Sequence, residues 1–230
     1  MSFGKNSRLL EELGAFLYPA HCVSCGAPDA WLCRSCEKEI TFLCAPLIVP
    51  PLPSGRPLVV KRLFALAMYT NKSWAKLITT IKYEGLRDVD ALLASIMCGV
   101  RKDFVSEWLF GDGEGVALVP VPTNPDHIEE RGSDHALVWL SAFQSMLPRA
   151  NIKTDLLKRR SGRAAHAALD TPGAREAAAE DAVAITGPVP ARIILVDDVY
   201  TTGSTIQACA RLLRDAGASD VEAFVAAASF

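Results

Sequence analysis

The sequence contains no long run of apolar residues. Although 50% of its 230 residues are hydrophobic, they are scattered alanines, valines and leucines, and no stretch approaches the roughly 18 to 20 apolar residues of a membrane-spanning helix. The first 22 residues carry Glu11 and Glu12 inside their apolar stretch and lack a compact apolar block before a small-residue cleavage site. We therefore expect a cytoplasmic protein with no membrane span and no signal peptide.

The chain also has little net charge. Its 24 Lys and Arg residues nearly balance 26 Asp and Glu residues, which leaves a net charge of -2. This balance gives no general reason to expect a protein that coats nucleic acid or binds a membrane surface. A chain of this length can bury a core without disulfides, so the composition predicts one globular domain with a small appendage.

The seven cysteines are unevenly distributed. Five lie between positions 22 and 44, and four of these form two CxxC pairs: Cys22, Cys25, Cys33 and Cys36. In a reducing compartment such pairs are typical of metal ligands, and four thiolates complete a closed Zn²⁺ shell. The spacing predicts a structural zinc knuckle, with a thioredoxin-like redox pair and unligated buried cysteines as alternatives. Cys44 has no CxxC partner, and Cys98 and Cys209 are predicted to be small core residues.

Proline divides the chain into parts. Residues 45–57 carry five prolines, a density that excludes regular structure and predicts a semi-rigid linker. Apolar residues at helical spacing predict an amphipathic helix over residues 6–18. We therefore predict three parts, namely a helix with a zinc knuckle in residues 1–44, the linker in residues 45–57 and a main domain in residues 58–230.

Apolar strands alternate with helices of about a dozen residues in the main domain. The predicted strands are residues 63–69, 116–121, 152–157, 193–196 and 221–226. The predicted helices are residues 74–81, 88–108, 134–147 and 204–216, and residues 158–166 are predicted to be a basic loop. This alternation is typical of an α/β fold in which helices cover both faces of a mainly parallel sheet.

The densest chemical signal is RIILVDDVYTTGST at residues 192–205. A predicted buried strand leads through two adjacent acids into a hydroxyl-rich turn, and a helix begins after this turn. Ligands of open α/β sheets bind beyond the carboxyl ends of the strands, where this turn is expected to lie. Hydroxyls and backbone N–H groups at a helix N-terminus suit a phosphate, and Asp197 and Asp198 can accept hydrogen bonds from two neighbouring hydroxyls, as on a ribose. The alternative is a plain strand-to-helix connection with Ser204 or Thr205 as N-cap. A P-loop is excluded, because the chain has no GxxxxGK[ST].

This segment resembles the phosphoribosyl-pyrophosphate (PRPP) signature of type I phosphoribosyltransferases, and the cysteine pairs narrow the resemblance to the ComF family. Further landmarks follow in the family's order: YTNKSWAKLITTIKY at 69–83, LVPVPTNPDHIEERGSDHALVWLSAF at 118–143 and LKRRSGRAAHAAL at 157–169. The resemblance covers nearly the whole chain. It implies a type I phosphoribosyltransferase-like fold, PRPP as ligand and Mg²⁺ bound with its pyrophosphate.

The resemblance also implies roles for individual residues. Asp197 and Asp198 would hold the ribose hydroxyls and are the implied catalytic residues. The 5-phosphate would be held by the turn after them, that is by Thr201, Thr202, Gly203, Ser204 and Thr205. Pyrophosphate would be contacted by Thr123 and Asn124 and approached by the cations Arg131, Arg160 and Arg163. The loop from Lys158 to His166 would form a hood over the site.

The implied activity is transfer of the phosphoribosyl group to a nitrogenous acceptor. The sequence does not identify this acceptor, because the chain reads RGSDH at 131–135 where relatives usually carry RGFNQ. One alternative is a non-catalytic module that binds PRPP or a nucleotide. Another follows from the family's association with natural competence, namely an accessory to single-stranded DNA uptake that works with DNA-processing proteins through the knuckle and residues 149–163. Residues 1–62 carry seven Lys or Arg against five Asp or Glu, a small excess for salt-dependent DNA binding.

Overall fold

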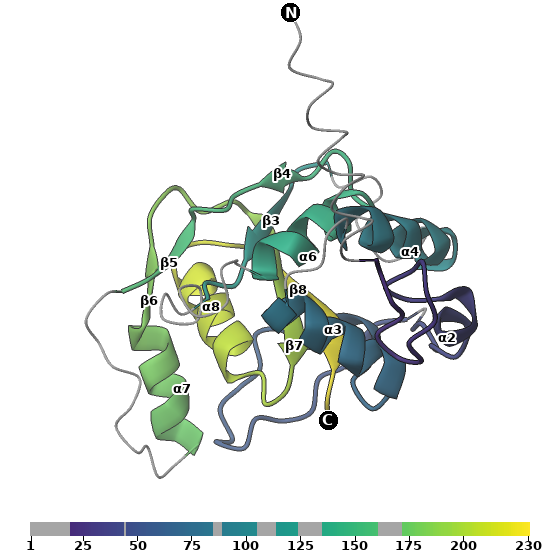
Figure 1. Ribbon diagram of the computed structural model, residues 1–230. Helices are drawn as coiled ribbons and strands as arrows, with labels where there is room; N and C mark the ends of the chain where they lie inside the picture. Colours follow the sequence, from purple (N-terminus) through teal and green to yellow (C-terminus); the bar gives the residue numbers. More distant parts are fainter. Residues whose placement is uncertain (1–18, 44, 85–88, 105–113, 124–134, 161–171) are drawn as a thin grey trace, which may run out of the picture.

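A six-stranded, mostly parallel sheet lies at the centre of the molecule (Figure 1). The computed structural model describes residues 19–43, 45–84, 89–104, 114–123, 135–160 and 172–230. In spatial order the sheet consists of β1 (Leu47–Ile48), β2 (Arg62–Met68), β8 (Asp220–Ala228), β7 (Arg192–Tyr200), β3 (Val116–Pro120) and β4 (Asn151–Ile152). Strands β2, β8, β7, β3 and β4 pair in parallel, and β1 pairs with β2 in the antiparallel direction.

Helices cover both faces of this sheet. One core lies under α3 (Lys72–Glu84), α4 (Val89–Phe104) and α6 (His135–Gln144). The other lies under α8 (Ser204–Asp215), against which α7 (Pro172–Asp181) packs, and under a two-stranded antiparallel sheet of β5 (Leu157–Arg159) and β6 (Val183–Ile185). A short helix, α2 (Arg34–Lys38), lies in the cysteine-rich segment. The predicted α/β class is thus confirmed, whereas the finer phosphoribosyltransferase-like fold stays a prediction.

Strand β7 explains why the sequence shows a continuous apolar run at residues 193–196. Ile193 and Leu195 belong to the core under α8, whereas Ile194 and Val196 belong to the core under α3, α4 and α6. A parallel strand that is covered on both faces is apolar at successive positions instead of at alternate ones. The run therefore marks β7 as a central strand.

Most predicted elements of the main domain are present with shifted ends. The strand predicted at 193–196 extends to Tyr200, and the helix predicted at 88–108 is described as α4 up to Phe104. The helix predicted at 6–18 lies outside the described residues, as does Cys44. In the part of the chain that the structure describes, no helix is long and apolar enough to cross a membrane.

The proline-rich segment contains regular structure, contrary to the prediction. Leu47 and Ile48 form β1, in which Leu47 lies opposite Leu63 of β2, and Val49 and Leu52 are buried. This two-residue strand fits between two prolines because it lies at the edge of the sheet, where a missing N–H donor leaves no gap in the hydrogen-bond ladder.

The strand predicted at residues 152–157 is wrong as a single element. Its first part is β4, which pairs with β3, and its last residue begins β5, which pairs with β6. Lys158 and Arg159, predicted in a loop, therefore lie in β5. Helix α7 and strand β6 were not predicted. The alanine-rich sequence of α7 lacks the apolar period on which a helix prediction depends, and β6 is only three residues long.

The cysteine-rich segment shares a core with the main domain. Cys22 and Cys36 are buried in the same apolar cluster as Trp74 of α3. The Oγ atoms of Ser24 and Ser73 lie 2.8 Å apart, and the Leu43 N–H donates to the Leu66 carbonyl oxygen at 2.8 Å. The predicted domain boundaries at residues 44 and 57 stay a prediction. These contacts show that the cysteine-rich segment packs against the main domain.

Gln207 of α8 ties its helix to the chain that enters β2. Its side chain is fully buried. The amide oxygen accepts from the backbone N–H groups of Val59 and Val60 at 2.9 and 3.1 Å, and the amide nitrogen donates to the Val60 carbonyl oxygen at 2.7 Å. One side chain thus satisfies three backbone groups, two of which belong to the fully buried Val60 and have no water to replace it.

We predict that Gln207→Leu lowers the free energy of unfolding by at least about 2 kcal/mol, because it leaves buried backbone groups without partners. Urea-induced unfolding measures this loss. The matched control is Gln144→Leu in α6, since the half-buried Gln144 side chain has no hydrogen bond to any described residue. Equal losses in both variants would contradict the assigned role of Gln207.

Candidate functional site

The carboxyl ends of β3 and β7 meet at one edge of the sheet. Pro120 lies opposite Val196, and the Val121 N–H donates to the Val196 carbonyl oxygen at 2.9 Å. The turn after β3 therefore runs beside Asp197, as expected for parallel neighbours whose carboxyl ends share an edge. Polar residues that are far apart in the sequence come together here.

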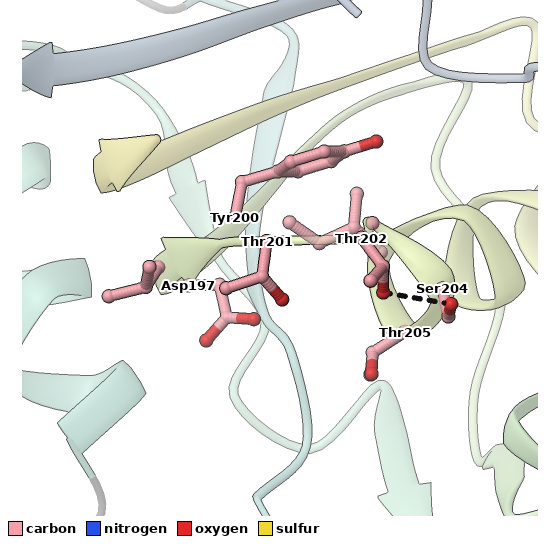
Figure 2. A pocket seen from close by; sticks show the side chains of 9 residues that line it. Asp197, Tyr200, Thr201, Thr202, Ser204 and Thr205 are labelled. Carbon is pink, nitrogen blue, oxygen red and sulfur yellow. Dashed lines mark hydrogen bonds between the residues drawn. The ribbon is translucent and has the colours of Figure 1, made fainter. Parts of the chain in front are cut away.

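A pocket with about 250 Å³ of empty space lies where β7 turns into α8. It is lined by Asp197, Val199, Tyr200, Thr201, Thr202, Gly203, Ser204, Thr205 and Ile206. Figure 2 shows the Asp197 carboxylate and the hydroxyl groups of Thr201 and Thr205 on one side of the turn, with the Tyr200 ring on the other. The structure thus brings Asp197 together with all five residues of the predicted phosphate turn.

Gly203 determines the shape of this turn. It is the N-cap of α8 and has a φ of 76°, in the left-handed region that glycine adopts without a penalty. A Cβ atom at this position would overlap the ring and hydroxyl of Tyr200. The predicted N-cap, Ser204 or Thr205, is wrong, because Ser204 is already the first helical residue, whereas the plain strand-to-helix connection stays an alternative.

The N-terminus of α8 has hydrogen-bond donors to offer. No side chain in the described part of the chain caps the helix at Gly203, and the hydroxyl groups of Thr202 and Ser204 lie 3.0 Å from each other. The first N–H groups of a helix have no partner inside the helix, and they carry the positive end of its dipole. The turn can therefore present N–H and O–H donors to one anion.

Asp197 and Asp198 lie within β7 and face in opposite directions. Successive side chains of a strand point to opposite faces of the sheet. Asp197 lines the pocket beside α8, and its Oδ1 atom accepts from the Asp198 N–H at 2.8 Å. Asp198 is not among the described residues that line the pocket, and its Oδ2 atom lies 2.9 Å from Nζ of Lys82 in α3.

Lys82 is a site residue that we did not single out in the sequence. A signal was present, because Lys82 follows Ile78 by four positions and so lies beside the apolar stripe of α3, on the face that meets the sheet. A lysine at such a position needs a counter-ion. The sequence does not identify that counter-ion, because Asp198 belongs to a distant segment.

A second pocket brings the turn after β3 next to the basic strand β5. It is lined by Pro120, Val121, Pro122, Thr123, Thr154, Leu157, Lys158 and Arg159. The Nε–H of Arg159 donates to the Pro122 carbonyl oxygen at 3.2 Å. Arg160 follows β5 and is exposed, while Asn124, Arg131 and Arg163 lie outside the described residues. Of the predicted pyrophosphate contacts, the structure therefore places Thr123 beside two cations.

The four cysteines of the two CxxC pairs come together as a candidate metal site. Their Sγ atoms all lie within 4.8 Å of one another. The Sγ atoms of Cys25 and Cys33 are 3.6 Å apart, close to the roughly 3.8 Å edge of a tetrahedron with Zn–S bonds of about 2.3 Å. Gly26, with a φ of 76°, closes the first turn through its N–H bond to the Cys22 carbonyl oxygen. The donor set and its spacing fit a metal such as zinc.

The pKa values of the two buried thiols, Cys22 and Cys36, are shifted in opposite directions. Burial alone would raise the pKa of Cys22, but hydrogen bonds from the backbone of Cys33, Cys25 and Ser24 outweigh it and lower the pKa to about 6. The Ser24 hydroxyl lowers the pKa of Cys36, but burial and the neighbouring cysteines outweigh this hydrogen bond and raise the pKa to about 12. A bound metal would have to displace the remaining protons, so binding is expected to weaken as the pH falls.

The other described cysteines lie outside the cluster. Cys209 is fully buried in α8, and burial, followed by the charge of Asp197, raises its pKa to about 12. It is the small core residue that the sequence predicts. Cys98 of α4 is exposed, so its predicted burial is wrong. It faces away from the core because it occupies the outer side of an amphipathic helix.

Together, the fold and these sites define an α/β protein with a hydroxyl-rich pocket at the carboxyl edge of its sheet and a four-cysteine cluster. No protein-family model matches the chain. The chain is similar to the competence protein ComFC of Streptococcus pneumoniae, with 31% identity over 163 residues, which are 69% of this chain and 65% of that protein. The chain thus spans a little under two thirds of this curated relative, and the similarity supports the resemblance to the ComF family.

A solved structure, that of the AQ2163 protein from Aquifex aeolicus, also aligns with the chain. The alignment covers 73% of this chain and 87% of that one, with a TM-score of 0.40 and 10% sequence identity. A likeness of this degree does not identify a fold.

We predict that protein purified without chelators contains about one zinc ion per chain, because the four thiolates form a closed shell. Cys25→Ser and Cys33→Ser should each lower the zinc content and the thermal midpoint. Metal analysis and thermal unfolding measure both effects. Cys98→Ser is the matched control and should change neither value. Well under one zinc ion in the unmodified protein would contradict the metal site.

We predict that Gly203→Ala destabilises the protein by at least about 2 kcal/mol more than Gly115→Ala, because added bulk at Gly203 displaces the Tyr200 ring. Both glycines have a positive φ, 76° and 73°, but no described atom lies within 4 Å of a Cβ built at Gly115. The control therefore carries the conformational penalty alone. Urea-induced unfolding compares the two variants, and equal losses would count against the Tyr200 contact.

Proposed function

We propose that this chain is a ComF-family protein that binds PRPP at the carboxyl edge of its sheet. The observation that carries the proposal is the pocket formed by Asp197 and the turn from Thr201 to Thr205. In this pocket a carboxylate lies beside a group of hydroxyls at the N-terminus of a 12-residue helix. These are the two kinds of group that a phosphorylated ribose requires.

The 5-phosphate would lie in the turn before α8. The helix start has N–H donors that no side chain of the described residues caps, the hydroxyl-bearing residues of the turn add O–H donors, and Gly203 lets the backbone come close. The pocket is lined mainly by polar groups, and these groups suit one anionic group. The rest of PRPP would extend along the sheet edge.

The ribose would lie next to the Asp197–Asp198 pair, with Asp197 on the pocket side. The pyrophosphate would lie toward the turn after β3, where Thr123 lines a second pocket with Lys158 and Arg159. Mg²⁺ prefers phosphate and water oxygens, so it would bind with the pyrophosphate. If an acceptor attacks the anomeric carbon, these cations would oppose the negative charge that grows on the leaving group. Arg131, Arg160 and Arg163 are proposed to add to this positive charge.

The four-cysteine cluster is proposed to hold a structural Zn²⁺. All four ligands come from the protein, so no position is left for a substrate. Cys22 and Cys36 are buried against α3, and the ion would therefore stabilise a segment that packs on the helix beside the ligand site.

We further propose that the protein serves competence, as the name of the pneumococcal relative suggests. It would act near single-stranded DNA together with DNA-processing proteins in the cytoplasm. The small positive excess of residues 1–62 favours contacts with such proteins over strong binding to the DNA backbone.

We predict that isothermal titration calorimetry with Mg²⁺ detects PRPP binding to the unmodified protein. Asp197→Asn should raise the dissociation constant at least about tenfold, because hydrogen bonds to a charged group contribute about 1.5 to 3 kcal/mol. The matched control is Asp215→Asn at the exposed end of α8, which should leave binding unchanged. No heat from the unmodified protein would overturn the proposal.

A second measurement distinguishes an enzyme from a binding module. Pyrophosphate release is followed while a panel of nucleobases and amines is added to the PRPP-bound protein. Release with one acceptor, and its loss in Asp197→Asn, would support transfer. Binding without release for every acceptor would favour the non-catalytic alternative.

A further inference from the structure

Helix α3 lies across the strands at the edge of the sheet that carries the pocket (Figure 1). Near its start, the Trp74 indole N–H donates to the Ala226 carbonyl oxygen of β8 at 2.8 Å. Near its end, Lys82 Nζ lies 2.9 Å from Asp198 Oδ2 of β7. Helix α3 therefore runs from β8 to β7 and places the ammonium group of Lys82 beside Asp198.

The start of α3 is held in place by the cysteine-rich segment. The Asn71 side-chain amide donates to the Glu39 carbonyl oxygen at 3.0 Å, and its oxygen accepts from the Trp74 N–H at 3.0 Å. The Phe42 ring packs edge-on against Trp74, with 5.6 Å between ring centroids. These contacts limit how far the helix can shift, and with it Lys82.

The Lys82–Asp198 pair is largely removed from water. The side chains are 20% and 17% exposed, so neither charge is fully solvated and their attraction is stronger than that of a surface pair. If one partner is removed, the other remains as a poorly solvated charge. The pair is therefore expected to act as a unit.

The pair lies next to a pocket whose donors suit an anion. The Asp198 N–H donates to Asp197 Oδ1 at 2.8 Å, and Asp197 lines that pocket. Without a cation beside it, the Asp198 carboxylate would add its negative charge next to this pocket and disfavour a phosphate. With Lys82 in place, the contribution of Asp198 to this negative potential is cancelled, and Asp197 supplies the carboxylate on the pocket side.

We propose that Lys82 is a positioning residue that neutralises Asp198 and so gives the two acids different roles. Asp197 contacts the ligand, whereas Asp198 holds α3 against the sheet edge and balances the charge of Lys82. This inference rests on the proposed function in that the pocket takes an anionic ligand. It differs from the expectation that both acids hold ribose hydroxyls.

The test compares Lys82→Met, Asp198→Asn, the double variant and Lys82→Arg, with Lys76→Met at an exposed position of α3 as the matched control. Each protein is titrated with PRPP and Mg²⁺ by calorimetry, and separately with inorganic phosphate by ³¹P NMR. Thermal unfolding of every variant shows whether it folds. The double variant removes both charges of the Lys82–Asp198 pair together, so it stays informative if Lys82→Met does not fold.

Lys82→Met should weaken the binding of both ligands about tenfold, which corresponds to about 1.4 kcal/mol. The double variant and Lys82→Arg should bind within about threefold of the unmodified protein, because charge balance is restored or kept. Asp198→Asn alone should bind phosphate at least as tightly as the unmodified protein. The control Lys76→Met should change nothing.

Three results would overturn the inference. If the double variant binds PRPP as weakly as Lys82→Met, Lys82 contacts the ligand itself. If Asp198→Asn and the double variant both lose PRPP but keep phosphate, Asp198 holds the ribose directly. If Lys82→Met binds both ligands normally, Lys82 does not compensate the charge of Asp198 at the pocket.

Failure of the proposed function gives a different pattern. If the unmodified protein binds phosphate but not PRPP, the proposed function is wrong, and the phosphate titrations still decide the role of Lys82. If the unmodified protein binds neither ligand, the pocket takes no anion and both proposals are overturned.

Discussion

The parallel pairing of β7 with β3 on one side and with β8 on the other is the constraint on which the candidate site depends. Because all three strands run in the same direction, their carboxyl ends form one edge, and the turns that follow them must lie together. Burial of β7 on both faces holds this register. The turn after β7 and the turn after β3 are neighbours for this reason.

Charge at this edge is arranged by the pleat of β7. Asp197 and Asp198 are adjacent in the chain, yet one faces the pocket beside α8 and the other faces α3. A strand that supplies two acids to two faces allows one of them to be paired with a lysine while the other stays next to the ligand pocket. Helix α3 makes this possible because it crosses the strands at their carboxyl ends.

The same helix links the cysteine cluster to the main sheet. Ser24 contacts Ser73 at its start, and Lys82 contacts Asp198 at its end. The buried Cys22 and Cys36 of the candidate metal site share a core with α3, so the cysteine-rich segment supports this helix from outside the sheet. The spacing of the cysteines alone does not show this packing.

The sequence by itself determined the features that depend on neighbouring residues: the apolar periods of α3, β7 and α8, the spacing of the cysteines, and the turn at Gly203. Only the tertiary structure decided the β5–β6 pairing, the edge strand β1 between prolines, and the partners of Lys82 and Gln207. Gln207 and Val59 are 148 positions apart. A periodic pattern is local, whereas a buried polar group takes its partner from whichever segment the packing of the sheet brings within reach.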